Sequence, residues 1–133
     1  MDITNLDLSN FLEKEEQVEY HKKLAQEAEA FLHSCGKQPL EVFRMEKFVP
    51  TPQEDEKTYG KFHEGDSYVI LKQNDEDYQI HYWHGKDATS DEMGASAFFS
   101  VQLSERLPKK SSHHLEEQNY ESDLFMSYFK NGI

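Results

Sequence analysis

The hydrophobic period changes along the chain, from three or four residues near the N-terminus to two further on. From residue 15 to residue 35, apolar side chains recur at steps of three, four and seven: Val18, Leu24, Ala28, Phe31, Leu32 and Cys35. This spacing predicts an amphipathic helix, and Gly36 is a plausible stop. Such a stripe more often packs on the protein's own domain than on a partner, and both roles stay open.

Period-two patterns follow this helix. Residues 41–48 alternate between two faces and predict a strand that Pro50 and Pro52 end. Residues 66–74 and 78–83 predict a β-hairpin. Its first strand contains a continuous apolar run, which is typical of a central strand buried on both faces.

The C-terminal part is predicted to be mainly helical. A capping hydroxyl followed by acidic residues predicts a long helix from about residue 91 to residue 107. Residues 111–114 are expected to be mobile and residues 115–120 to form a short strand. A second capping serine before an apolar run predicts a short helix at residues 122–129.

Length and the distribution of bulky residues favour one domain with an appendage. The chain has 133 residues, which is enough for one compact core. Most aromatic and β-branched residues lie between residues 40 and 107, whereas the first 36 residues are mostly charged or small. We therefore expect an N-terminal, partly helical extension at residues 1–36 and a folded domain at residues 37–133.

The charge balance narrows the class of partner. The formal net charge is −12, and such a surface repels nucleic acid. The surplus of carboxylates favours cations such as calcium. Phosphoinositide binding is possible but has little support, because Lys109, Lys110 and Lys130 are too few to predict a basic site.

Cysteine use and the terminal sequence favour a cytoplasmic location. Cys35 is the only cysteine, so neither an intrachain disulfide nor a cysteine-based zinc site is expected. No apolar run approaches the ~18 residues that would span a bilayer, so membrane insertion is not expected. The first ten residues do not resemble a signal peptide.

Histidines and acidic clusters offer weak alternatives to a binding function. His81 and His84 are three residues apart, and on a strand this spacing places them on opposite faces. The acidic stretch at residues 74–78 lacks the glycine and terminal glutamate of an EF-hand loop. Signatures of a phosphate loop or a nucleophile elbow are also missing, so we do not expect an enzyme.

Four segments carry a family resemblance. They are VFRMEKF at 42–48, YGKFHEGDSYVILK at 59–72, IHYWHGKDATSDEMGASAFFSVQL at 80–103 and ESDLFMSYFKNG at 121–132. In this order the chain resembles the gelsolin, villin and severin family, above all its first homology domain. The resemblance implies an α+β fold: a mixed sheet of five to six strands between one long and one short helix.

The resemblance also implies a calcium site. In the family, the carbonyl of a glycine, the carboxylate of the following aspartate and a glutamate near the start of the long helix bind Ca²⁺. The matching positions are Gly65, Asp66 and Glu92. Carboxylate and carbonyl oxygens suit calcium, although the same residues could serve only as a turn and a helix cap. The family's fourth protein ligand lies beyond Ile133, so we expect weakened affinity.

A second calcium, shared with actin in the family's first domain, is expected to be weak here. Its aspartate follows the VQL of the long helix, and this chain has Ser104 at that position. A hydroxyl is a poorer calcium ligand than a carboxylate, so the site would depend on Glu105.

The long helix is the expected actin-binding element. If Phe99 joins Ala95 and Leu103 on the inner side, Phe98 points outward or sideways. The outward set is Phe98, Val101, Gln102 and Glu105. In the family, the residue matching Phe98 enters an apolar cleft of actin, although Phe98 could instead pack under the N-terminal extension.

The resemblance therefore implies a calcium-responsive, cytoskeleton-associated actin-binding module. We expect it to sequester actin monomers or cap filament ends. We expect weak or no severing of filaments by this chain alone, because severing usually requires more than one contact with actin. The alternative is a gelsolin-like structural or protein-interaction module without actin binding.

Overall fold

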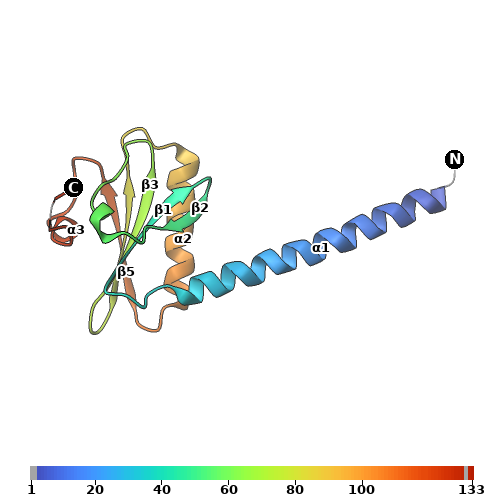
Figure 1. The fold of residues 1–133 in the computed structure, drawn as a ribbon, viewed down its shortest axis with the longest axis horizontal. Helices are drawn as coiled ribbons and strands as arrows, with labels where there is room; N and C mark the ends of the chain where they lie inside the picture. Colours follow the sequence, from blue (N-terminus) through green and yellow to red (C-terminus); the bar gives the residue numbers. More distant parts are fainter. Residues whose placement is uncertain (1–2, 131) are drawn as a thin grey trace. The chain divides into compact units, whose positions relative to one another are not determined.

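The structure is a computed structural model that describes residues 3–130 and 132–133. It divides into two compact units, Met1–Ser34 and Cys35–Ile133. The first unit is the helix α1, Ile3–Ser34 (Figure 1), which begins well before the stripe predicted from residue 15. Val18 and Leu24 of that stripe are exposed. None of the helices in the described residues is long and apolar enough to cross a membrane.

The second unit is built on a five-stranded mixed sheet in the order β2-β1-β3-β4-β5. All neighbouring strands are antiparallel except β4 and β5, which are parallel. This confirms the predicted sheet, with five strands rather than six. The strands are β1 Leu40–Glu46, β2 Val49–Pro52, β3 Ser67–Gln73, β4 Tyr78–His84 and β5 Ser111–Glu117.

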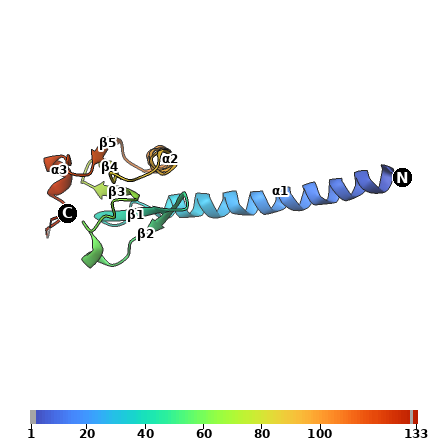
Figure 2. The same cartoon turned by 90° about the horizontal axis from the view of Figure 1, so that it is seen from above.

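One long and one short helix cover the two faces of this sheet. The long helix α2, Ser90–Arg106, and the short helix α3, Asp123–Met126, lie on either side of it (Figure 1), and Figure 2 shows the same elements from above. A 3-10 turn at Glu56–Thr58 lies between β2 and β3. The prediction of a sheet between a long and a short helix is confirmed.

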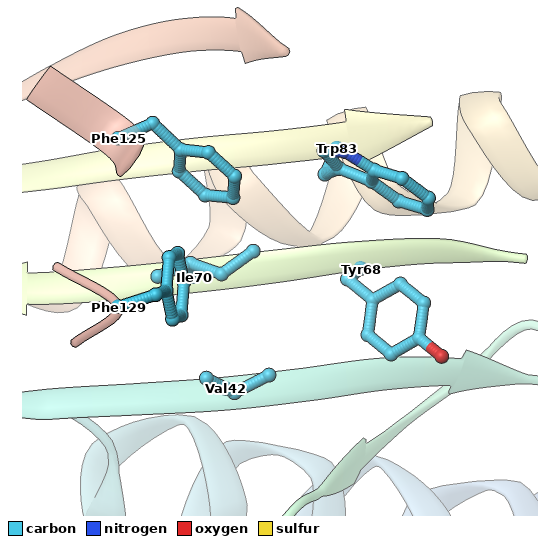
Figure 3. Packing of buried hydrophobic residues seen from close by; sticks show 6 residues of the cluster. All are labelled: Val42, Tyr68, Ile70, Trp83, Phe125 and Phe129. Atoms are coloured by element: carbon cyan, nitrogen blue, oxygen red, sulfur yellow. The ribbon is translucent and has the colours of Figure 1, made fainter. Parts of the chain in front are cut away.

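The two faces of the sheet hold separate apolar layers. Tyr68 and Ile70 of β3 face α3, whereas the alternate residues Val69 and Leu71 face α2, and all four are buried. The layer beneath α3 is a cluster of six side chains (Figure 3): Val42, Tyr68, Ile70, Trp83, Phe125 and Phe129. The run from Tyr68 to Leu71 is therefore buried on both faces, as its sequence predicts.

The prediction that Pro50 and Pro52 end the first strand region is wrong, because both lie in the edge strand β2. They pair with Met45 and Phe43 of β1. The residue after β2, Gln53, donates its N–H to the Val42 carbonyl at 2.8 Å, so the hydrogen-bonded positions alternate with the prolines. The proline ring nitrogens therefore point away from β1. Because β2 is an edge strand with no neighbour on that side, the missing N–H groups remove no hydrogen bond from the sheet.

The C-terminal predictions need two corrections. Residues 111–114, expected to be mobile, form the first half of β5, which runs to Glu117 rather than to residue 120. Strand β5 is an edge strand whose exposed polar residues give no alternating apolar signal. The short helix is confirmed, but it covers only Asp123–Met126, with Ser122 as its N-cap.

A buried polar network joins the sheet to α3. The carboxylate of Glu116 accepts from His81 Nδ1 at 2.9 Å and from the Ser122 N–H at 2.7 Å. His81 Nε2 lies 2.8 Å from the Tyr128 hydroxyl. Because a carboxylate only accepts, we place the imidazole proton on Nδ1, and Nε2 accepts from Tyr128. Burial lowers the pKa of His81 more than Glu116 raises it, and burial raises the pKa of Tyr128 to about 12.

Protonation of His81 should destabilise the domain. Its pKa is depressed in the folded protein, so the unfolded chain binds more protons below its ordinary value of about 6.5. The stability is fully present above that pH and is lost as the pH falls toward the depressed value. We expect the melting temperature to drop between about pH 7.5 and about pH 5.5, and His81→Gln to reduce this slope. His113 is exposed, so His113→Gln should leave the slope of melting temperature against pH unchanged. Equal slopes in the unmodified chain and in both variants would contradict the assignment to His81.

Candidate functional site

Two loops interlock at the end of the sheet where β3 begins and β4 ends. The N–H of Gly85 donates to the Asp66 carbonyl at 3.0 Å, and the N–H of Asp87 donates to the Glu64 carbonyl at 2.9 Å. The second loop leads directly into α2, whose N-cap is Thr89. The structure therefore anchors Asp66 and the start of α2 at the same end of the sheet.

Glu92 lies in the first turn of α2. Its N–H donates to Thr89 Oγ1 at 3.2 Å, and the same hydroxyl lies 3.3 Å from Glu92 Oε1. Glu92 Oε2 is buried and has no hydrogen-bond partner within the described part of the chain. A buried acceptor without a partner is costly, so this oxygen is suited to a cation.

Asp66 makes its side-chain contacts with an arginine. Arg44 Nη2 and Nε donate to Asp66 Oδ2 at 2.7 and 3.1 Å. Beside it, Gly65 is open, since a methyl group built on this residue would meet no atom within 4 Å. Sequence reasoning missed Arg44, although its place on β1, opposite Tyr68 of β3, brings it next to the start of that strand.

The predicted calcium ligands would not complete a calcium site by themselves. Among residues 3–130 and 132–133, no group of three or more His, Cys, Asp or Glu side chains gathers in a geometry that could hold a metal ion. The predicted ligands comprise two carboxylates, those of Asp66 and Glu92, and one neutral oxygen, the Gly65 carbonyl. Calcium needs about six to eight oxygen ligands, so water or another chain would have to supply the remainder.

The residues of the expected second calcium site point to other partners. The Ser104 hydroxyl lies 2.7 Å from that of Ser111 on β5. Glu105 is exposed, and its Oε2 lies 3.5 Å from Arg106 Nη1. A calcium ion shared by Ser104 and Glu105 with a partner stays a prediction.

Helix α2 turns an aromatic side chain outward. Phe98 is 65% exposed and Val101 is 49% exposed, whereas Phe99 is only 2% exposed. Gln102 is half-buried at the border of this face, and Glu105 is exposed. Phe99 meets Phe43 of the sheet edge-to-face, with ring centroids 5.3 Å apart. The outward orientation expected for Phe98 is therefore present.

The inward stripe of α2 differs in one respect from the expected one. Its buried residues are Ser96, Phe99, Ser100 and Leu103, whereas Ala95 is only half-buried. The serine hydroxyls donate to helix carbonyls, Ser96 to Met93 at 2.8 Å and Ser100 to Ser96 at 2.9 Å. Because these hydroxyls are hydrogen-bonded, burying the two serines against the sheet leaves no polar group without a partner.

Sequence comparison identifies the family. The sequence model of the gelsolin repeat matches residues 48–126. The chain belongs to the gelsolin family. The gelsolin of Gallus gallus is 42% identical over 107 residues, a match that covers 74% of this chain and 13% of that protein. "Actin depolymerising venom protein gelsolin 1" of Platymeris rhadamanthus is 39% identical over 104 residues, covering 73% of this chain and 27% of that protein.

Solved structures share the gelsolin fold. The Thorarchaeota 2DGel3, solved in a complex with rabbit actin, superposes with a TM-score of 0.60 at 21% identity, over 72% of this chain and 45% of that chain. The Thorarchaeota ProGel, also solved with rabbit actin, gives a TM-score of 0.57 at 15% identity, over 68% and 98%. This chain spans only a small part of the curated gelsolins that it matches.

The interlocked loops of this gelsolin repeat predict a large effect for one glycine substitution and a small effect for another. A methyl group on Gly85 would lie 2.1 Å from the Glu64 carbonyl oxygen, whereas one on Gly65 would meet nothing within 4 Å. Gly85→Ala should therefore lower the free energy of unfolding by about 2 kcal/mol, as overpacking does. Gly65→Ala should change it by less than about 0.5 kcal/mol. Denaturant unfolding measures both, and equal values would refute the close approach of the two loops.

Proposed function

We propose that this gelsolin repeat binds actin through the outward face of α2, with Phe98 as the anchor. The observation that carries the proposal is the 65% exposure of Phe98 on a helix whose opposite side is packed on the sheet. Leaving such a large aromatic group in water is unfavourable unless a partner covers it. Two solved gelsolin-like neighbours are complexes with actin, and one relative is named as actin-depolymerising.

The composition of this face supports a protein partner. An aromatic anchor beside Val101, bordered by Gln102 and Glu105, has the arrangement of an interface hot spot with a polar rim. We propose a non-enzymatic, cytoskeletal role in which the repeat sequesters actin monomers or caps filament ends. A single helix face provides one contact with actin, so filament severing by this repeat should be weak.

Truncation of Phe98 tests the actin interface. Phe98→Ala should weaken actin binding by about 2 kcal/mol, roughly thirtyfold, because hot-spot aromatics carry most of the interface energy. Pyrene-actin assembly and fluorescence titration measure the loss.

The matched control is Leu124→Ala, which removes an exposed apolar side chain from α3 on the opposite face of the sheet. It should bind actin like the unmodified chain. If Phe98→Ala also binds normally, the interface lies elsewhere. If the unmodified chain leaves assembly unchanged at micromolar concentration, the repeat is a structural module without actin binding.

We further propose that calcium binds between the two interlocked loops, held by the Gly65 carbonyl and the carboxylates of Asp66 and Glu92. The buried Oε2 of Glu92 supports this proposal, because it has no hydrogen-bond partner among the residues that the structure describes and a cation would compensate its burial. A bound ion would tie the loop before β3 to the first turn of α2. It would thereby stabilise the helix that carries Phe98.

Substitution of two neighbouring acidic residues distinguishes calcium binding from an effect of charge on the helix dipole. Asp91 and Glu92 both lie in the first turn of α2, and Asp91 is exposed. Glu92→Gln should abolish calcium binding in calorimetry and the calcium-induced rise in melting temperature. Asp91→Asn should retain both, although it removes the same charge from the same turn. Equal effects of the two substitutions would argue against a site at Glu92.

A further inference from the structure

The carboxylate of Asp66 already has a cationic partner within the protein. Arg44 reaches it from β1 with two nitrogens, Nη2 at 2.7 Å and Nε at 3.1 Å, both directed at Oδ2. The pair is partly shielded from water, since the side chains are 32% and 22% exposed. The 2.7 Å contact from Nη2 has the length of a strong charge-assisted hydrogen bond. The contact is therefore a substantial part of the environment of Asp66.

We propose that Arg44 competes with calcium for Asp66 and so lowers the calcium affinity of this repeat. The inference rests on the proposed calcium site. A guanidinium cannot lose its proton, so it remains a fixed positive charge beside any cation that Asp66 binds. Its repulsion of a divalent ion and its hold on Oδ2 act in the same direction, against calcium.

A second acidic residue gives Arg44 an alternative partner. Glu46 lies two residues along β1, and its Oε1 is 3.7 Å from Arg44 Nη1. Arg44 can therefore stay paired when Asp66 turns toward an ion. This arrangement makes the exchange reversible without leaving an unpaired charge.

The opposite role, in which Arg44 orients Asp66 for calcium, has less structural support. The backbone of Asp66 is held independently of Arg44. Its N–H donates to the His63 carbonyl at 3.1 Å, and its carbonyl accepts from the Gly85 N–H at 3.0 Å. Loss of the arginine would thus leave the position of Asp66 in place and free only its carboxylate.

Calorimetric calcium titration of three variants of the full chain tests the competition. Arg44→Gln removes the charge but keeps a polar side chain, and it should tighten calcium binding on the order of fivefold. Arg44→Lys keeps the charge but loses the two-nitrogen contact with Oδ2, so it should tighten calcium binding less than Arg44→Gln does. Lys47→Gln removes a neighbouring exposed charge in the turn between β1 and β2, and it controls for net charge. It should stay within about twofold of the unmodified chain.

Thermal melting gives an independent readout. Without calcium, Arg44→Gln should melt a few degrees lower than the unmodified chain, because Asp66 loses its partner. Saturating calcium should remove this deficit, since the ion then replaces the guanidinium. A melt also verifies that each variant is folded before its affinity is compared.

The possible results separate this inference from the proposed function. Unchanged or weaker calcium binding by folded Arg44→Gln would overturn the competition while leaving the calcium site intact. Equal tightening by Lys47→Gln would also overturn it, because the effect would then reflect net charge alone. If the unmodified chain binds no calcium even at millimolar concentration, the proposed calcium site itself fails.

Discussion

The double burial of β3 determines the arrangement of the rest of the domain. Because Tyr68 and Ile70 need cover on one face and Val69 and Leu71 on the other, the sheet requires a helix on each side. Helix α3 and its neighbouring aromatic residues supply one cover, and α2 supplies the other. A helix that packs on the sheet along one stripe exposes its opposite side. The candidate partner face of α2 is therefore a consequence of the need to cover β3.

The elements with strong hydrophobic periodicity could be predicted from the sequence, whereas the edge strands of the sheet could not be predicted in full. The hairpin of β3 and β4 and the helix α2 combine clear apolar patterns with recognisable caps. Strand β2 was missed because prolines normally end a strand, and because its turn uses Lys47 and Phe48 with positive φ instead of Asn-Gly. Strand β5 was missed in part because exposed edge residues need no apolar alternation.

The candidate site also has some features that local sequence predicts and others that only the folded structure shows. Helical period alone places Phe98 about 100° away from Phe99. Capping rules place Glu92 in the first turn of α2. The contact between Arg44 and Asp66 joins residues 22 positions apart. It depends on the register between β1 and β3, which a single sequence does not determine. The burial of Glu92 Oε2 depends on how the surrounding loops pack, which local sequence patterns do not determine.

The two proposed sites share one helix but not one face. Glu92 and Phe98 are separated by six positions, which is about 9 Å along the axis and an angular separation of about 120° around it. An ion at Glu92 would therefore not touch the side chains beside Phe98. The middle of α2 is held to the sheet by the buried Phe99 and Leu103, and close-packed contacts of this kind resist small shifts. Calcium would thus act on the first turn of α2 and its loops, so that its effect on a partner arises through the stability of the helix.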